Sequence, residues 1–105
     1  MTDFYVGQYG TADSMLTIGV GEDISANNNE IVFDKPGGST VTKTATVGLV
    51  DVEIDGQILL AGQYVQYTFI EDDLDREGNW GVKVLTYPPG GGVNPSSRTL
   101  MTVGS

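Results

Sequence analysis

The residues best suited to chemistry are the carboxylates of an acidic run at positions 71–78. Asp73, Asp75 and Glu77 have the spacing of the first, third and fifth ligands of a calcium-binding EF-hand loop, and the glycine that ends the run matches its sixth position. The twelfth position, which needs a bidentate glutamate, falls on Val84. These three acids are therefore only a partial calcium site. We expect instead a solvated turn whose aspartates cap their own backbone, with no cofactor and no calcium requirement for folding.

Other catalytic machinery is sparse. The chain has no histidine and no cysteine, which removes the usual base near neutral pH, the thiol nucleophile and the soft metal ligands. Glu71 and a second acid would form a glycosidase-like pair only if a fold held them across a cleft. The glycine-rich residues 88–92 lack the Lys-Ser or Lys-Thr of a phosphate-binding loop, which indicates a hairpin tip. We expect a protein that is not an enzyme.

Charge and hydropathy restrict the partners. Fourteen acidic residues against five basic ones give a formal net charge of −9, which repels phosphate backbones and anionic membranes. No segment approaches the roughly 20 apolar residues needed to cross a bilayer, and the N-terminus lacks the basic and apolar parts of a signal peptide. We therefore expect no nucleic acid partner, no membrane partner and synthesis in the cytoplasm.

The elements that must position these residues are strands. Apolar and polar residues alternate with a period of two in segments separated by turn-forming glycine, proline, asparagine and aspartate, which is typical of half-buried strands. Residues 1–105 form one domain by length, and its fold class is all-β. The expected strands are Phe4–Gln8, Ser14–Val20, Glu30–Lys35, Thr40–Val47, Val50–Ile54, Gln57–Leu60, Gln63–Ile70, Asn79–Thr86 and Arg98–Val103.

Two local patterns are specific enough to predict geometry. Asp55-Gly56 between two apolar runs predicts a two-residue type I′ hairpin, because both central residues must accept positive φ. The threonines of strand Thr40–Val47 recur at every second position, which predicts a solvent-facing row on one strand face. An ice-binding or ligand ladder is the alternative for this row.

Aromatic residues mark the expected core. Trp80 lies in phase with the valines of strand Asn79–Thr86, as expected of a ring that fills the centre of a sandwich; a ligand-stacking role is the alternative. Tyr64 lies out of phase with Tyr67 and Phe69, so one strand carries aromatic rings on both faces. This arrangement predicts at least one ring available to a partner.

Two stretches carry a resemblance, Lys35-Pro36-Gly37-Gly38-Ser39-Thr40-Val41-Thr42 and Asp73-Leu74-Asp75-Arg76-Glu77-Gly78-Asn79-Trp80-Gly81-Val82-Lys83. They resemble the K-P-x-G-[ST]-x-[VT] and D-L-D-x-x-G-x-W-x-[VIL] patterns of immunoglobulin-like domains in tailed-phage virion proteins, and the chain is similar to the N-terminal domains of the baseplate upper protein family. The resemblance implies an immunoglobulin-like β-sandwich of about 7–9 antiparallel strands. Residues 48–62 and 88–95 depart from that pattern.

The resemblance also implies a function. It suggests a non-enzymatic structural or docking component of a virion, attached to a tail, baseplate or fibre, with other virion proteins and its own copies as partners in a symmetric assembly. A capsid decoration protein is one alternative, which copy number per particle would distinguish. A carbohydrate-binding module that uses calcium at the acidic turn and exposed tyrosines is another.

The docking surface is expected at the sheet edges, because an open edge strand must be charged, covered or paired. Phe4–Gln8 carries no charge and Arg98–Val103 carries one at its start, so both offer backbone groups to a neighbouring chain. We expect the N-terminal segment to become ordered against a neighbour on assembly. The candidate interface residues are Phe4, Tyr5, Val6 and Tyr9.

Overall fold

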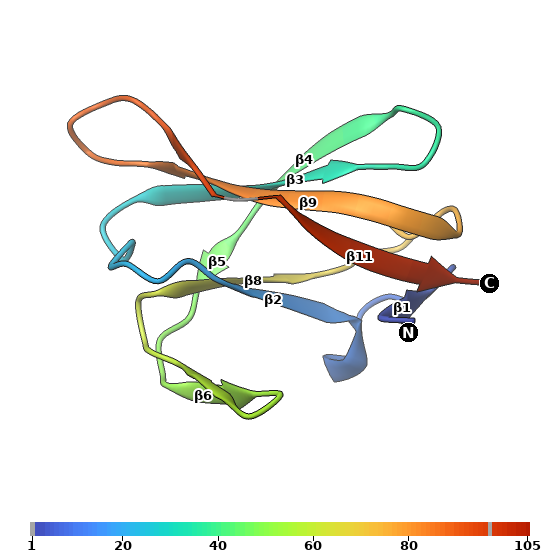
Figure 1. The fold of residues 1–105 in the computed structure, drawn as a ribbon, viewed down its shortest axis with the longest axis horizontal. Coiled ribbons are helices and arrows are strands. Elements are labelled where there is room, and N and C mark those ends of the chain that lie inside the picture. Colours follow the sequence, from blue (N-terminus) through green and yellow to red (C-terminus); the bar gives the residue numbers. More distant parts are fainter. Residues whose placement is uncertain (1, 97) are drawn as a thin grey trace.

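A computed structural model describes residues 2–96 and 98–105 as an all-β protein, which confirms the predicted fold class. Figure 1 shows two sheets stacked face to face, with a short hairpin below them. The upper sheet has the order β1 (Phe4–Tyr5), β11 (Thr99–Gly104), β9 (Gly78–Tyr87), β3 (Asn28–Asp34) and β4 (Thr40–Thr44), with β10 (Asn94–Pro95) also paired to β9. The lower sheet has the order β2 (Met15–Gly19), β8 (Tyr64–Thr68) and β5 (Thr46–Val47). The hairpin is formed by β6 (Val52–Ile54) and β7 (Gln57–Leu59), and one 3₁₀ turn spans Ala12–Ser14.

One side of the sandwich is closed by a strand that changes sheets. The expected strand Thr40–Val47 is divided at Ala45, whose N–H donates to Asn29 O at 2.9 Å before the chain continues as β5 in the other sheet. Ala45 itself is buried. The four threonines of β4 and β5 are all exposed, as the alternation predicts.

The core lies between the two sheets and is aromatic at its centre. The Phe33 ring centroid lies 6.3 Å from that of Trp80 and 5.6 Å from that of Phe69, and Phe69 lies 4.9 Å from Phe4 in an edge-to-face contact. Trp80 is 1% exposed, which confirms the predicted core position. Alternate residues of β9 bury their side chains in the same layer, including Val82 and Val84.

The N-terminal segment differs from its prediction. Its strand has only two residues and runs parallel to β11, so the expectation of purely antiparallel pairing is wrong. Gly7 turns the chain with a φ of +85°, and the Tyr5 N–H donates to Gln8 Oε1 at 3.0 Å, which caps the outer edge. Phe4 packs in the core and is only 6% exposed, unlike the expected docking residue. β1 and Asp3 cover only the end of β11, from Thr102 to Gly104, and no described strand pairs with Thr99–Met101 on that side.

The hairpin at residues 48–62 has the predicted turn. Asp55 and Gly56 have φ values of +50° and +81°. The segment folds back over the outer face of the lower sheet, where Tyr64 Oη donates to Val50 O at 2.6 Å. Tyr64 faces away from Tyr67 as predicted, but it is 1% exposed because the segment covers it, so the expected accessible ring is not found there.

Candidate docking surfaces

The acidic turn is a structural anchor. Tyr67 Oη donates to Asp73 Oδ2 at 2.5 Å, the Ile70 N–H donates to the same oxygen at 2.9 Å, and Lys43 Nζ lies 3.2 Å from Asp73 Oδ1. The backbone bond to Ile70 is the capping that the sequence predicts. Partial burial alone would raise the pKa of the Asp73 carboxyl, but the Tyr67, Ile70 and Lys43 contacts together hold it below its ordinary value. Burial, aided by Asp73, raises the pKa of Tyr67.

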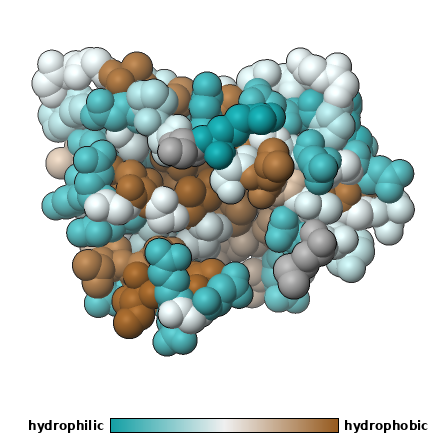
Figure 2. Space-filling view, in the orientation of Figure 1, coloured by the Kyte–Doolittle hydropathy of each residue, from teal (hydrophilic) through white to brown (hydrophobic). Residues whose placement is uncertain are grey.

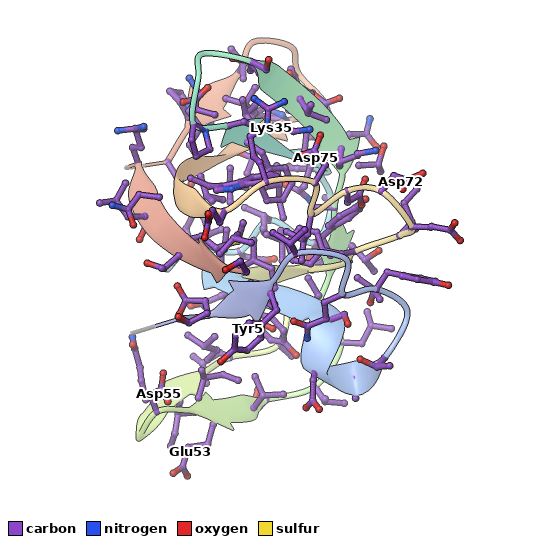
Figure 3. All side chains as sticks on the ribbon, turned by 90° about the vertical axis from the view of Figure 1, so that its right-hand side faces the viewer. Tyr5, Lys35, Glu53, Asp55, Asp72 and Asp75 are labelled. Carbon is purple, nitrogen blue, oxygen red and sulfur yellow. The ribbon has the colours of Figure 1, made fainter. Side chains whose placement is uncertain are left out.

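The partial calcium loop is not assembled as a ligand set. Lys35 Nζ donates to both carboxylate oxygens of Asp75 at 3.1 Å and lies 5.4 Å from the centroid of the Trp80 ring. Figure 3 shows Lys35 beside Asp75, whereas Asp72 points away into solvent. Glu77 is exposed. Within residues 2–96 and 98–105, no three acidic, histidine or cysteine side chains lie close enough to share a metal ion.

We predict that Asp73→Asn lowers the free energy of unfolding by about 1–2 kcal/mol at neutral pH, because the charged acceptor of two hydrogen bonds and an ion pair is lost. A carboxyl with a depressed folded pKa stabilises the fold above its unfolded pKa, and this stabilisation is lost as the pH falls through the folded pKa. The difference between variant and parent should therefore shrink below about pH 4. Urea unfolding from about pH 7 to about pH 2 measures it.

Asp72→Asn is the matched control. Asp72 is exposed, and its φ of +71° is a conformation that asparagine also accepts. This variant should unfold within about 0.5 kcal/mol of the parent at every pH. Equal losses in the two variants would mean that general charge reduction, not the contacts of Asp73, sets the stability.

Exposed large apolar side chains are most frequent on the hairpin segment. We use the term apolar hairpin surface for five side chains with exposed fractions between 42% and 87%, namely Leu49, Val50, Ile54, Ile58 and Leu60. Because Ile58 is paired with Glu53, it lies on the opposite face of the hairpin from Ile54. Figure 2 shows hydrophobic atoms gathered at the lower edge of the molecule, where Figure 1 places β6. The alternation in the sequence predicts that Val50 and Ile54 share one face of a half-buried strand. Val52 and Leu59, which share that face of the hairpin, are half-buried, and Leu59 lies close to Gly19 of β2, whereas Ile54 on the same face remains 42% exposed.

A groove of about 1030 Å³ opens between the two sheets on the side opposite the β4–β5 crossing. β2 forms one wall, and β10, β11, Ser96 and Arg98 form the other. Figure 2 shows the groove as a hollow with hydrophobic atoms at its base, facing the viewer. Of the predicted interface residues, Tyr5, Val6 and Tyr9 are exposed, but they do not line this groove.

No protein-family model, no curated protein and no solved structure matches the chain. None of the helical residues that the structure describes forms a helix of the length and hydrophobicity needed to cross a bilayer. The functional argument therefore depends on the surfaces themselves. Two of them are unusual for a small acidic domain: the apolar hairpin surface and the groove beside β2.

Proposed function

We propose that this chain is a non-enzymatic, immunoglobulin-like docking module of a tailed-phage virion. The observation that carries the docking role is the apolar hairpin surface, five large aliphatic side chains exposed within a dozen residues. It projects from the lower sheet on a segment that departs from the phage-domain pattern. An acidic domain gains nothing in solubility from such a surface, and a partner protein would bury it.

The strand order supports the immunoglobulin-like assignment. In that fold, strands C, F and G form one sheet and strands A, B, E and D the other. Here β3, β9 and β11 are adjacent in the upper sheet, and β2, β8 and β5 are adjacent in the lower one. In chain order, β3, β9 and β11 correspond to strands C, F and G. In the same way, β2, β8 and β5 correspond to strands B, E and D. β4 takes the place of the extra strand beside C in variable-type domains.

A side-chain contact near the start of β9, which we call the corner contact, also supports the immunoglobulin-like assignment. Immunoglobulin domains have a tyrosine near the start of strand F whose hydroxyl bonds to the backbone a few residues upstream. Trp80 lies near the start of β9, and its Nε1–H donates to Arg76 O at 3.2 Å. The side chain type differs, but the position and the bond direction are alike.

The two stretches that carry the phage resemblance also contact each other. Arg76 Nη1 donates to Pro36 O at 2.9 Å. A Cβ atom on Gly78 would lie 2.8 Å from Pro36 Cγ, so the close approach of the two stretches requires a glycine there. Lys35 and Asp75 join them again by their ion pair. The two stretches that resemble the phage domains therefore form one contact between two turns. A resemblance that covers both sides of one contact supports a common fold more directly than two separate motifs would.

The test of the docking role is incorporation into particles of the phage that encodes the chain. The double variant Leu49→Lys, Ile58→Lys should fold normally, because both side chains are exposed, and should be depleted from purified particles by about tenfold or more. Val93→Lys, at an exposed apolar side chain outside the hairpin segment, is the matched control and should incorporate at the parental level. Incorporation of the double variant at that level would exclude the apolar hairpin surface as the docking site.

The number of copies per particle distinguishes a tail or baseplate location from a location on the capsid. Quantitative mass spectrometry of particles should find a small multiple of three or six copies for a tail or baseplate component, as closed symmetry requires. Copies on the order of hundreds would instead indicate capsid decoration. Absence of the chain from purified particles would exclude a virion role altogether.

A further inference from the structure

The lower sheet has an open edge at β2. β2 pairs with β8 through the register Met15 with Thr68 to Gly19 with Tyr64, and among the described strands it has no second partner. The Phe69 N–H donates to Ser14 O at 2.9 Å and the Val20 N–H donates to Gln63 O at 2.8 Å, at the two ends of this ladder.

These two bonds determine which backbone groups of β2 are free. In an antiparallel ladder, alternate residues point their N–H and C=O groups at the partner. Leu16 and Ile18 are in phase with Ser14 and Val20, so their groups face β8. The N–H and C=O groups of the alternate residues face outward, and no described residue bonds to them. These residues are Met15, Thr17 and Gly19.

The open edge lies beside an apolar groove. Leu16, Ile18 and Val20 are partly buried against the core and line the groove from below, while Thr99–Met101 line it from above. A strand added to β2 would place every second side chain into this groove and would continue the sheet. The immunoglobulin-like sheet has a strand A at this place, next to B, and the described chain supplies none there.

Charge identifies the kind of strand that fits. Four acidic residues line the groove, namely Asp3, Asp13, Glu22 and Asp55. The basic residue that lines it is Arg98, whose Nε lies 3.6 Å from Asp34 Oδ2, so its charge is partly balanced. A second copy of this chain has a net charge of −9 and would be repelled. A cationic segment would be attracted.

We propose that the β2 edge accepts an extended segment of a partner protein, about five residues long, with alternating apolar side chains and lysine or arginine at its ends. The length follows from the five residues of β2. This inference deepens the proposed function by giving the chemistry of one partner, and it depends on that function only in assigning the partner to a virion.

The test uses the full chain and a synthetic peptide, Lys-Val-Thr-Val-Thr-Val-Lys, with an isomer that carries glutamate at both ends. Backbone amide exchange measured by NMR should slow by about tenfold at Met15, Thr17 and Gly19 when the lysine peptide binds. The glutamate peptide should bind at least about tenfold more weakly. Equal binding of the two peptides would exclude the charge argument.

Thr17→Pro and Thr42→Pro form a matched pair of variants. Each removes an N–H that points out of a sheet edge, Thr17 on β2 and Thr42 on β4, and neither N–H pairs within its own sheet. Thr17→Pro should weaken the lysine peptide by at least about tenfold, while Thr42→Pro leaves its affinity unchanged. Circular dichroism establishes that both variants fold.

The outcomes separate this inference from the proposed function. Strand addition at β2 would be overturned if folded Thr17→Pro binds the lysine peptide as tightly as the parent does. It would also be overturned if millimolar peptide gives the β2 amides of the parent no protection from exchange. Neither result would bear on the apolar hairpin surface. Protection of the β2 amides that rises with protein concentration, together with dimers in light scattering, would show that a second copy is the occupant and would also overturn the proposal. Particle incorporation of the Leu49→Lys, Ile58→Lys double variant tests only the proposed function and does not test strand addition at β2.

Discussion

Trp80→Ala is expected to lower the free energy of unfolding by about 3–5 kcal/mol. The indole is 1% exposed, meets Phe33 edge to face and donates to Arg76 O, so its removal leaves a cavity and an unpaired carbonyl together. A domain of this size has a total stability of about 5–15 kcal/mol. Urea unfolding followed by circular dichroism should therefore show a midpoint shifted far toward zero denaturant.

Trp80→Phe separates the two contributions. It keeps an aromatic ring beside Phe33 and removes the donor to Arg76 O, and it should cost less than the alanine variant, about 2 kcal/mol. If Trp80→Ala unfolds at nearly the parental midpoint, the indole is not the centre of the core. In that case the corner contact offers no support for the immunoglobulin-like assignment.

Local patterns predicted local geometry well. The type I′ turn at Asp55-Gly56 was predictable because it depends on two residues alone, and the exposed threonine row followed from alternation within one strand. The in-phase burial of Trp80 with the valines of β9 followed in the same way. Each of these features is determined within about ten residues of sequence.

Features set by distant segments were not predictable. Tyr64 is buried because residues 48–62 fold over it, and Phe4 is buried because β1 docks beside β11 at the far end of the chain. The alternation gives the face of a side chain but not what covers that face. The same limit hid both candidate surfaces. The sequence did not indicate that Ile58 is exposed, and it assigned the open edges to Phe4–Gln8 and Arg98–Val103 without indicating the edge at β2.

Gly48→Ala is expected to cost about 2–3 kcal/mol, the second-largest effect of a single substitution that we predict. A Cβ atom at this position would overlap the ring of Tyr64. The backbone cannot retreat, because the Gly48 N–H donates to Tyr64 O at 3.0 Å and its carbonyl accepts from the Gly62 N–H at 2.9 Å. The ring must move instead, and its bond to Val50 O is then lost.

Gly81→Ala is the matched control for this overlap. A Cβ atom on Gly81 would also overlap a side chain, but that side chain is the guanidinium of Arg98, which is 58% exposed and can swing into solvent. The control should lose less than about 1 kcal/mol. If the two variants lose equal stability, the fit between Gly48 and Tyr64 does not hold the hairpin segment in place. The expected result is that Gly48→Ala alone is destabilised and that amide exchange rises across residues 49–61 in that variant only. This result would show that the Tyr64 ring holds the segment with the apolar hairpin surface against the sandwich.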